Sequence, residues 1–377
     1  MVFVMVATAE RAVARIDLGA VERNCAQLAS QLSDGAELCA VVKADGYGHG
    51  ADDCATAALK GGATRLAVAT AREAEQIGRR FQHVPLLTMG ALTPEEADVA
   101  LDGGSEIAVW RDGFLRLAAD RARAQGRPAR VHIKHDSGMG RLGTADPGEV
   151  AGLAGACAED PHLELAGVWT HFATADEPES DFFDEQLRRF APLASELKSQ
   201  HPEITVHAAN SAALFRDPAS HFDMARCGIA VYGLDPFHDD PAERGLQPAL
   251  ELRSYVADVK RFVAGASAGY GRTWRASEDT WVGVLPIGYG DGVRRGLSNN
   301  GEVLVGGRRY PLVGTVSMDN ITIDLGSDTE VEPGAEAVLI GSQGSERILA
   351  EEVARRLDTI NYEVTCGISQ RVPRASR

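Results

Sequence analysis

The chain has 377 residues, 44% hydrophobic and 24% charged, which is typical of a globular protein long enough for two domains. Its net charge of −16 argues against a nucleic-acid or anionic-membrane partner, although it leaves room for a local positive pocket. No apolar run approaches the roughly 18 residues of a membrane span, and residues 1–6 lack the basic flank of a signal peptide. The six cysteines show neither a CxxC pair nor metal-ligand spacing, so we expect reduced, buried thiols and no metal site. We therefore expect a cytoplasmic protein.

Short apolar runs alternate with longer amphipathic segments over the first part of the chain. This alternation predicts parallel strands joined by crossover helices. Eight repeats in roughly 220 residues fit a closed (β/α)8 barrel, and an open doubly wound sheet is the alternative. No G-x-G-x-x-G turn is present, which disfavours a dinucleotide-binding fold. The expected strands are 38–42, 65–69, 84–89, 105–110, 130–134, 165–169, 204–208 and 228–233, and the expected helices include 51–60, 71–79, 94–101, 112–125 and 182–199.

The first of these strands leads directly into a lysine and a glycine-rich turn. Segment 41–50 reads VVKADGYGHG. Lys43 thus follows a buried strand, at the end where α/β folds hold their ligands. A desolvated lysine loses its proton more easily, and a neutral amine can attack a carbonyl. A strand-end lysine that simply reaches solvent is the alternative.

Segment 41–50 resembles the cofactor-lysine signature of the alanine racemases, which are pyridoxal 5′-phosphate enzymes. The resemblance implies an α/β chain with a (β/α)8 TIM-like barrel followed by a C-terminal mostly-β domain. It implies that Lys43 is the Schiff-base lysine and that Tyr47 contacts the cofactor phosphate. Asp45 and Gly46 replace the more usual Asn-Ala of the family, which adds a negative charge near the lysine.

A second strand ends in a similar charged and glycine-rich turn at residues 131–143. Period-2 alternation puts His132 and Lys134 on the same side of this strand, and an isolated inward lysine needs a partner or a modification. The resemblance implies that Lys134 is an N-carboxylysine and that Arg141 contacts the cofactor and the substrate carboxylate. A carbamate could orient that guanidinium by bidentate hydrogen bonds. A solvent-facing arginine on an ordinary turn is the alternative.

Three later strand ends carry further candidate residues. His171 follows the strand 165–169, where a satisfied core histidine is the ordinary interpretation. Hydroxyls and free backbone N–H groups at segments 207–212 and 226–233 could form an anion cradle. The resemblance implies that His171 lies beside the cofactor ring and Arg226 against the pyridine nitrogen, and it assigns the phosphate to Ser211, Gly228 and Ile229.

The sequence pattern changes after residue 235, where several prolines precede strand-like segments with short turns. We expect strands at 252–263, 280–287, 302–305, 308–316, 320–325 and 336–340 and a helix at 349–357. The expected domains are therefore residues 12–240 for the barrel and 241–377 for the β-domain. By resemblance, the N-terminal strand 12–18 pairs with the β-domain.

The β-domain holds the remaining candidates. Tyr270 lies between two glycines in an exposed turn, where an ordinary turn aromatic is the alternative. The resemblance implies that Tyr270 is the second acid/base and enters the partner subunit's site in a homodimer with shared active sites. It likewise implies that Met318 and Asp319 cross the interface, that Tyr289 lines the access channel, and that Tyr362 contacts the phosphate.

These motifs occur in the family's order from about residue 15 to residue 374. They imply an isomerase that interconverts L-alanine and D-alanine by two-base Cα proton transfer on a pyridoxal phosphate aldimine, supplying D-alanine for cell-wall peptidoglycan. A broader-specificity amino-acid racemase and a fold-related pyridoxal-phosphate decarboxylase are the alternatives. The decarboxylase would require an acidic partner for the pyridine nitrogen, where this chain has Arg226. A cofactor-carrier protein would not need the second domain, and a metal-dependent hydrolase would need carboxylate ligands that the motifs lack.

Overall fold

The computed structural model describes residues 10–377, so the apolar segment 1–6 lies outside the described residues. The described residues divide into two compact units: residues 21–231, and residues 232–377 together with residues 10–20. This division falls at 231/232, whereas the sequence analysis places the domain boundary at 240/241. Among residues 10–377, no helix has both the length and the apolar character needed to span a bilayer.

The first unit is a closed barrel of eight parallel strands, as the sequence analysis predicts. Each strand pairs with its sequence neighbours, and β9 pairs with β2 to close the barrel. The strands are β2 (Glu37–Val41), β3 (Arg65–Val68), β4 (Leu86–Thr88), β5 (Glu106–Val109), β6 (Ala129–Lys134), β7 (Leu163–Trp169), β8 (Thr205–His207) and β9 (Met224–Cys227).

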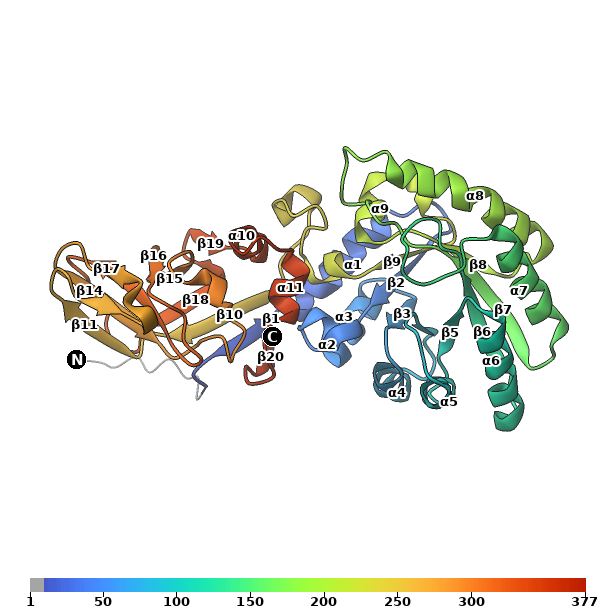
Figure 1. Ribbon diagram of the computed structural model, residues 1–377, viewed down its shortest axis with the longest axis horizontal. Helices are drawn as coiled ribbons and strands as arrows, with labels where there is room; N and C mark the ends of the chain where they lie inside the picture. The colour runs from blue at the N-terminus through green and yellow to red at the C-terminus, as the bar shows by residue number, and fades with distance from the viewer. Residues whose placement is uncertain (1–9) are drawn as a thin grey trace. The chain divides into compact units, whose positions relative to one another are not determined.

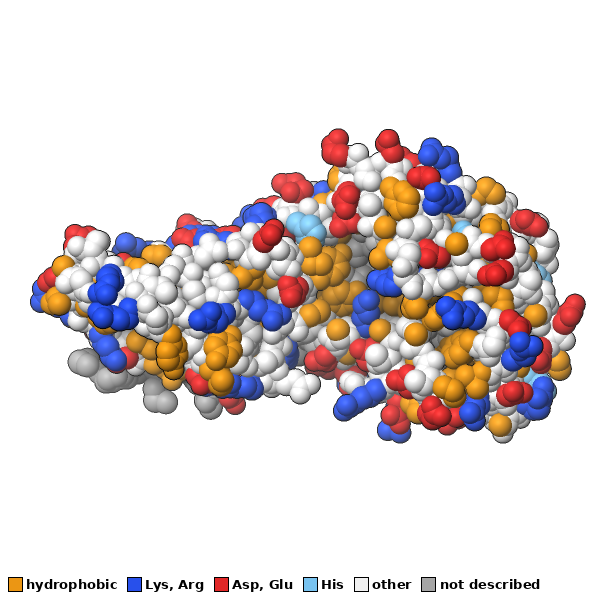
Figure 2. Space-filling model, viewed as in Figure 1, with side chains coloured by type: hydrophobic (Ala, Val, Ile, Leu, Met, Phe, Trp, Pro, Cys, Tyr) orange, Lys and Arg blue, Asp and Glu red, His pale blue; other side chains and the backbone are white. Residues whose placement is uncertain are grey.

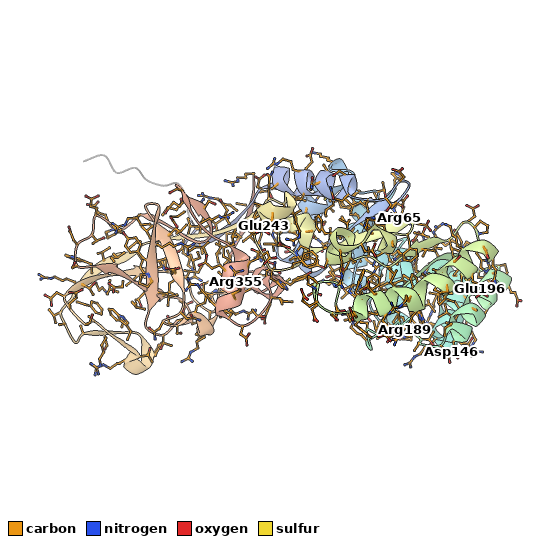
Figure 3. The ribbon with its side chains drawn as sticks, turned by 90° about the horizontal axis from the view of Figure 1, so that it is seen from above. Arg65, Asp146, Arg189, Glu196, Glu243 and Arg355 are labelled. Atoms are coloured by element: carbon orange, nitrogen blue, oxygen red, sulfur yellow. The ribbon has the colours of Figure 1, made fainter. Side chains whose placement is uncertain are left out.

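Helices surround the barrel strands (Figure 1). They are α1 (Leu18–Ser30), α3 (Ala51–Lys60), α4 (Ala71–Arg80), α5 (Pro94–Asp102), α6 (Asp112–Gln125), α7 (Pro147–Glu159), α8 (Phe182–Gln200) and α9 (Ser211–Arg216), with a 3-10 turn η1 (Pro218–Ser220). The segment labelled α2 (Lys43–Tyr47) is a short left-handed turn that follows β2. Arg189 and Glu196 lie on α8 in Figure 3. Acidic and basic side chains alternate over the face of this unit seen in Figure 2, so that face carries no large patch of one sign.

The sequence-based expectation for the eighth strand is wrong. The strand is β9 (Met224–Cys227), and the apolar run after it forms a 3-10 turn, η2 (Ile229–Tyr232). This run is bounded by glycines and closes on itself, because the Val231 N–H donates to the Gly228 carbonyl at 3.0 Å. Apolar character alone therefore misplaced the strand by four residues, and Arg226 lies within β9 rather than before it.

The second unit is built around a ten-stranded sheet. The N-terminal strand β1 (Val13–Ile16) pairs antiparallel with β10 and parallel with β20. The expected strand 252–263 is broken into two, and a hairpin at Gly306–Gly307 joins β15 to β16. Its strands are β10 (Leu250–Tyr255), β11 (Asp258–Phe262), β14 (Thr280–Leu285), β15 (Glu302–Val305), β16 (Arg308–Val313), β17 (Ile321–Gly326), β18 (Glu336–Gln343), β19 (Glu346–Ile348) and β20 (Arg374–Ser376).

Short elements complete this unit. They are a two-stranded ribbon of β12 (Ser267–Ala268) and β13 (Trp274–Arg275), the 3-10 turns η3 (Pro241–Arg244), η4 (Tyr270–Arg272) and η5 (Arg295–Leu297), and the helices α10 (Ala350–Arg356) and α11 (Asn361–Cys366). Arg355, labelled in Figure 3, lies on α10. Cys366 on α11 is exposed, which corrects the expectation of six buried thiols; the other five cysteines are buried.

Candidate active site

Lys43 lies where β2 ends, at the start of a short turn with unusual backbone geometry. Residues 44–48 all have positive φ, between 51° and 86°. A left-handed turn of this kind costs roughly 1–2 kcal/mol for each residue that is not glycine, so neighbouring groups must hold it in place. The Lys43 Nζ atom lies 5.9 Å from the centre of the Tyr47 ring. The turn therefore presents the amine and the phenol to the same side of the barrel mouth.

Two carboxylates hold this turn. One oxygen of Glu73 accepts the Ala44 N–H at 2.7 Å, while its other oxygen accepts the N–H groups of Ala69 and Thr70. Asp45 accepts the N–H of Ala51, the first residue of α3, at 3.0 Å. Asp45, one of the departures from the family pattern, therefore acts as a backbone acceptor.

Ser211, Gly228, Ile229 and Tyr47 form a small polar cradle. The Ser211 hydroxyl oxygen accepts the Gly228 N–H at 3.0 Å, and Ile229, as the first residue of η2, has no acceptor for its N–H within that turn. A Cβ added to Gly228 would lie 2.2 Å from the Tyr47 hydroxyl oxygen, so only glycine fits against the phenol. A phenol, a hydroxyl and backbone N–H groups are the donors that hold a phosphate.

Arg226 is a buried guanidinium held from several sides. Its Nη2 donates to the carbonyls of Thr170 and Ala208 at 2.9 and 3.1 Å and to Nδ1 of His171 at 3.2 Å. Its Nη1 donates to Nδ1 of His207 at 2.8 Å. The Nε–H donates to none of residues 10–377. Burial lowers the pKa of Arg226 to about 10, so the guanidinium keeps its proton at neutral pH.

Lys134 is buried among other cations. Its Nζ lies 4.1 Å from the centre of the Trp169 ring, and its side chain is only 2% exposed. Burial, followed by the charges of Arg226 and Arg141, lowers the pKa of Lys134 to about 7. Arg141 is exposed beside it. A substantial fraction of Lys134 is therefore a neutral amine at physiological pH.

His171 accepts from Arg226 through Nδ1, which places its proton on Nε2. Burial, followed by the charge of Arg226, lowers the pKa of His171 well below its usual value. The charges of Lys134, Arg141 and Lys43 act in the same direction. His171 is therefore a neutral donor within a cluster of cations, and such a cluster favours an anionic ligand.

The β-domain candidates gather on one surface of that unit. The N–H groups of Tyr289 and Gly290 donate to the carbonyls of Ser317 and Met318 at 3.0 and 2.9 Å. The Tyr270 carbonyl accepts from the Thr315 hydroxyl at 2.8 Å. Tyr270, Met318 and Tyr289 are 75%, 51% and 44% exposed, and Arg371 donates to Asp319 at 2.7 Å.

Tyr362 lies on α11, where its ring centre is 6.3 Å from that of His238. The roles of these β-domain residues toward a barrel site remain predictions.

Sequence reasoning missed two side chains that shape the barrel site. Trp169 lies under both Lys134 and Arg226, with the Arg226 carbon 4.8 Å from its ring centre, and it stacks on His207 with ring centres 5.6 Å apart. His207 binds Arg226 directly. Trp169 is the last residue of β7 and His207 is the last residue of β8. An aromatic or histidine side chain at a strand end, close to predicted cations, is the sequence signal that could have identified them.

Family models for the alanine racemase N-terminal domain and the alanine racemase C-terminal domain match residues 16–236 and 249–376. The chain is 45% identical over 364 residues to an alanine racemase from Symbiobacterium thermophilum, covering 96% of both proteins. It is 42% identical to that of Geobacillus stearothermophilus, covering 96% of this chain and 92% of the relative.

Solved structures agree with this relationship. A crystal structure of alanine racemase from a D-cycloserine-producing Streptomyces lavendulae superposes with a TM-score of 0.92 at 36% identity, covering 98% of each chain. The Bacillus anthracis enzyme with bound L-Ala-P superposes with a TM-score of 0.89 at 38% identity, covering 98% of this chain and 96% of that one.

Proposed function

The chain belongs to the alanine racemase family, and on that premise we propose that its barrel binds pyridoxal 5′-phosphate and that its active site is shared between two subunits. The family interconverts L-alanine and D-alanine, so the chain is an isomerase. The supply of D-alanine for peptidoglycan, in the cytoplasm, is the role that we propose for it.

One observation carries the cofactor proposal: the barrel brings together a group suited to each polar part of pyridoxal phosphate. Lys43 offers an amine for the aldehyde. The cradle of Ser211, Gly228, Ile229 and Tyr47 offers donors for the phosphate, and its packing admits no side chain at position 228. Arg226 offers an Nε–H for the pyridine nitrogen. The chemistry of these side chains therefore matches the polar parts of the cofactor.

Arg226 would determine how strongly the cofactor ring withdraws electrons. When bound, the cofactor would acidify the Cα–H of the attached amino acid by drawing electrons into its ring. Arg226 keeps its proton, so it can donate a hydrogen bond to the ring nitrogen without protonating it. By leaving the ring nitrogen unprotonated, Arg226 would limit electron withdrawal from Cα and so would favour return of the proton, as racemisation requires.

Two bases of different chemistry would transfer the Cα proton, one on each face of the substrate. Lys43 would act on the D face, and the partner subunit's Tyr270 on the L face. The neutral His171 would donate from Nε2 toward that phenol, because its Nδ1 is occupied by Arg226. The exposure of Tyr270, Tyr289 and Met318 on one surface of the β-domain supports a role in a second subunit.

Arg141 would bind the substrate carboxylate, and a modified Lys134 would position Arg141. The neutral amine of Lys134 can attack carbon dioxide, forming a carbamate and releasing a proton. The surrounding cations, Arg141 and Arg226 among them, favour the resulting anion. Such a carbamate would hold the exposed Arg141 guanidinium in place for the carboxylate. Tyr289, Tyr362 and Met318 would restrict the site to a small side chain.

Activity of single variants tests the proposal. L-alanine is supplied to the holoenzyme, and formation of D-alanine is followed by circular dichroism. Lys43→Ala and Tyr270→Phe should each lower kcat by at least about a hundredfold, because each removes a proton-transfer group. Tyr255→Phe, an exposed tyrosine on β10, is the matched control and should retain full activity. Full activity in Tyr270→Phe would refute the two-base assignment.

A further inference from the structure

Four buried ionisable side chains from four different strands are joined end to end inside the barrel. Glu106 Oε2 lies 2.6 Å from His132 Nε2, His132 Nδ1 lies 2.9 Å from His207 Nε2, and His207 Nδ1 lies 2.8 Å from Arg226 Nη1. Each of the four residues is at most 5% exposed. Glu106 is the first residue of β5, so the series begins at the amino ends of the strands and finishes at the proposed cofactor site.

The two ends of this series decide where every proton lies. A guanidinium can only donate hydrogen bonds, so His207 must accept at Nδ1 and carry its proton on Nε2. The Nε2–H of His207 donates to His132 Nδ1, so His132 also carries its proton on Nε2. The Nε2–H of His132 then donates to the Glu106 carboxylate. All three bonds therefore run in one direction, from a cation to an anion through two neutral imidazoles.

The surroundings of Glu106 keep it an acceptor. Arg130 Nε lies 2.8 Å from one carboxylate oxygen, and Nη1 of Arg65, a β3 residue labelled in Figure 3, lies 3.5 Å from the other. Burial alone would raise the pKa of Glu106, but the hydrogen bond from His132 and the charges of Arg130 and Arg65 outweigh it and hold the pKa below its usual value. Burial, followed by the charge of Arg226, lowers the pKa of His207 well below its usual value.

An independent feature of β7 makes this arrangement possible. Strand β7 lies between β6 and β8, so the two histidines must meet across it. At the crossing point β7 carries Gly167, where an added Cβ would lie 2.4 Å from His132 Nδ1. That nitrogen is the atom that accepts from His207. A glycine at this position therefore leaves the space that the histidine–histidine bond occupies.

We propose that Glu106, His132 and His207 are positioning residues that hold Nη1 of Arg226 through this one-directional series and supply its buried counter-charge. The Nε–H of Arg226 is thereby kept available and aimed at the pyridine nitrogen. The inference rests on the proposed cofactor site only in this last step. The proton positions and the bonds themselves are properties of the chain.

Histidine tautomers give a direct test, with internal references in the same barrel. His221 accepts the Ser33 N–H at Nδ1 and donates from Nε2 to the Leu214 carbonyl, so it reports the Nε2–H form. His135 donates from Nδ1 to the Thr144 carbonyl and reports the Nδ1–H form. In long-range 1H–15N spectra of 15N-histidine-labelled protein, with and without pyridoxal phosphate, His132 and His207 should match His221. A doubly protonated ring or the Nδ1–H form at either position would overturn the proposal.

Two variants test whether the series acts on Arg226. Gly167→Ala should displace His132, mix the tautomers of His207 and lower kcat about tenfold or more, while KM changes less than about twofold. Gly155→Ala, in open space on α7, is the matched control. Glu106→Gln keeps an acceptor but removes the charge, and should also lower kcat about tenfold. It provides a second route if Gly167→Ala does not fold. Unchanged kcat in the variants that fold would overturn the positioning role.

The spectra separate this inference from the proposed function. If the protein binds no pyridoxal phosphate, the proposed function fails, while the tautomers of the unliganded protein still decide whether the series exists. If the cofactor binds and the tautomers differ from those stated, only the further inference fails.

Discussion

At the scale of single residues, the environment of Lys134 has a direct consequence for stability. This lysine is buried against Trp169 and near Arg226 and Arg141, and its pKa falls to about 7. In the unfolded chain its pKa would be near 10.5. Between these two values the unfolded state binds more protons than the folded state. Stability therefore rises with pH across this window and is lost as pH falls from 10.5 toward 7.

Because stability rises with pH in this window, the variant Lys134→Met gives a measurable prediction. In urea titrations without carbon dioxide, the variant should be more stable than the parent at pH 7, because it has no buried ammonium to neutralise. The stability difference should shrink by about 3 kcal/mol between pH 7 and pH 10. Bicarbonate at pH 8 should stabilise the parent and leave the variant unchanged. A difference that does not vary with pH would contradict this account of Lys134.

The sequence identifies a site residue well when that residue belongs to a motif. It identifies poorly a residue that contacts the motif from another part of the chain. Lys43, Arg141 and Arg226 could be named because the glycine-rich turns around them resemble a known family. Trp169 and His207 lie in equally visible segments, but their importance is a contact with a residue far away in sequence. A strand pattern gives the direction of a side chain and not the identity of its neighbours across the barrel.

At the scale of elements, the left-handed turn after β2 is supported by a neighbouring helix. Glu73 closes the capping box at the start of α4 with Thr70 and also accepts the Ala44 N–H. The next helix, α5, begins with the same box, formed by Thr93 and Glu96. The two boxes differ in that Glu73 also binds the lysine turn.

Because only Glu73 also binds the lysine turn, substitutions of Glu73 and Glu96 form a matched pair of variants. Glu73→Ala and Glu96→Ala should each lower the free energy of unfolding by about 1 kcal/mol, because each loses a capping box. Only Glu73→Ala should weaken pyridoxal phosphate binding, by about tenfold, since it alone frees the turn that carries Lys43. A fluorescence titration of the cofactor-free proteins measures the affinity. Equal affinities in the two variants would show that the turn holds its shape without Glu73.

Most barrel elements could be placed from hydrophobic periodicity, since a buried parallel strand is a short apolar run and its helix is amphipathic. The misplaced eighth strand shows the limit of this signal. The true strand β9 contains Arg226, and a buried charge interrupts the apolar run. The more apolar segment 228–233 has the pattern of a strand, although its first residues, Gly228 and Ile229, form part of the cradle. The pattern therefore failed where the interior is functional rather than apolar.

At the scale of the whole molecule, the chain contains both halves of the proposed site in separate units. The barrel holds Lys43, and the β-domain holds the exposed Tyr270. If the site is shared, each half can be disabled on a different subunit.

Mixed dimers test this directly. Lys43→Ala and Tyr270→Phe subunits, inactive alone, are unfolded together and refolded. In a mixed pair one site carries both lesions and the other carries none. Random pairing makes half of the dimers mixed, so activity should recover to about a quarter of the parent value. A control mixture of Lys43→Ala with a Lys43→Ala, Tyr270→Phe double variant should stay inactive. No recovery in the first mixture would contradict a shared site.

The central claim is that the Lys43 amine binds an aldehyde cofactor covalently. The absorbance spectrum of the purified protein, recorded after addition of pyridoxal phosphate and removal of the excess, measures this most directly. We predict a visible band that borohydride abolishes, with the reduced cofactor fixed on the peptide containing Lys43, and no such band in Lys43→Ala. A colourless protein that retains no pyridoxal phosphate, or an identical band in Lys43→Ala, would contradict the account.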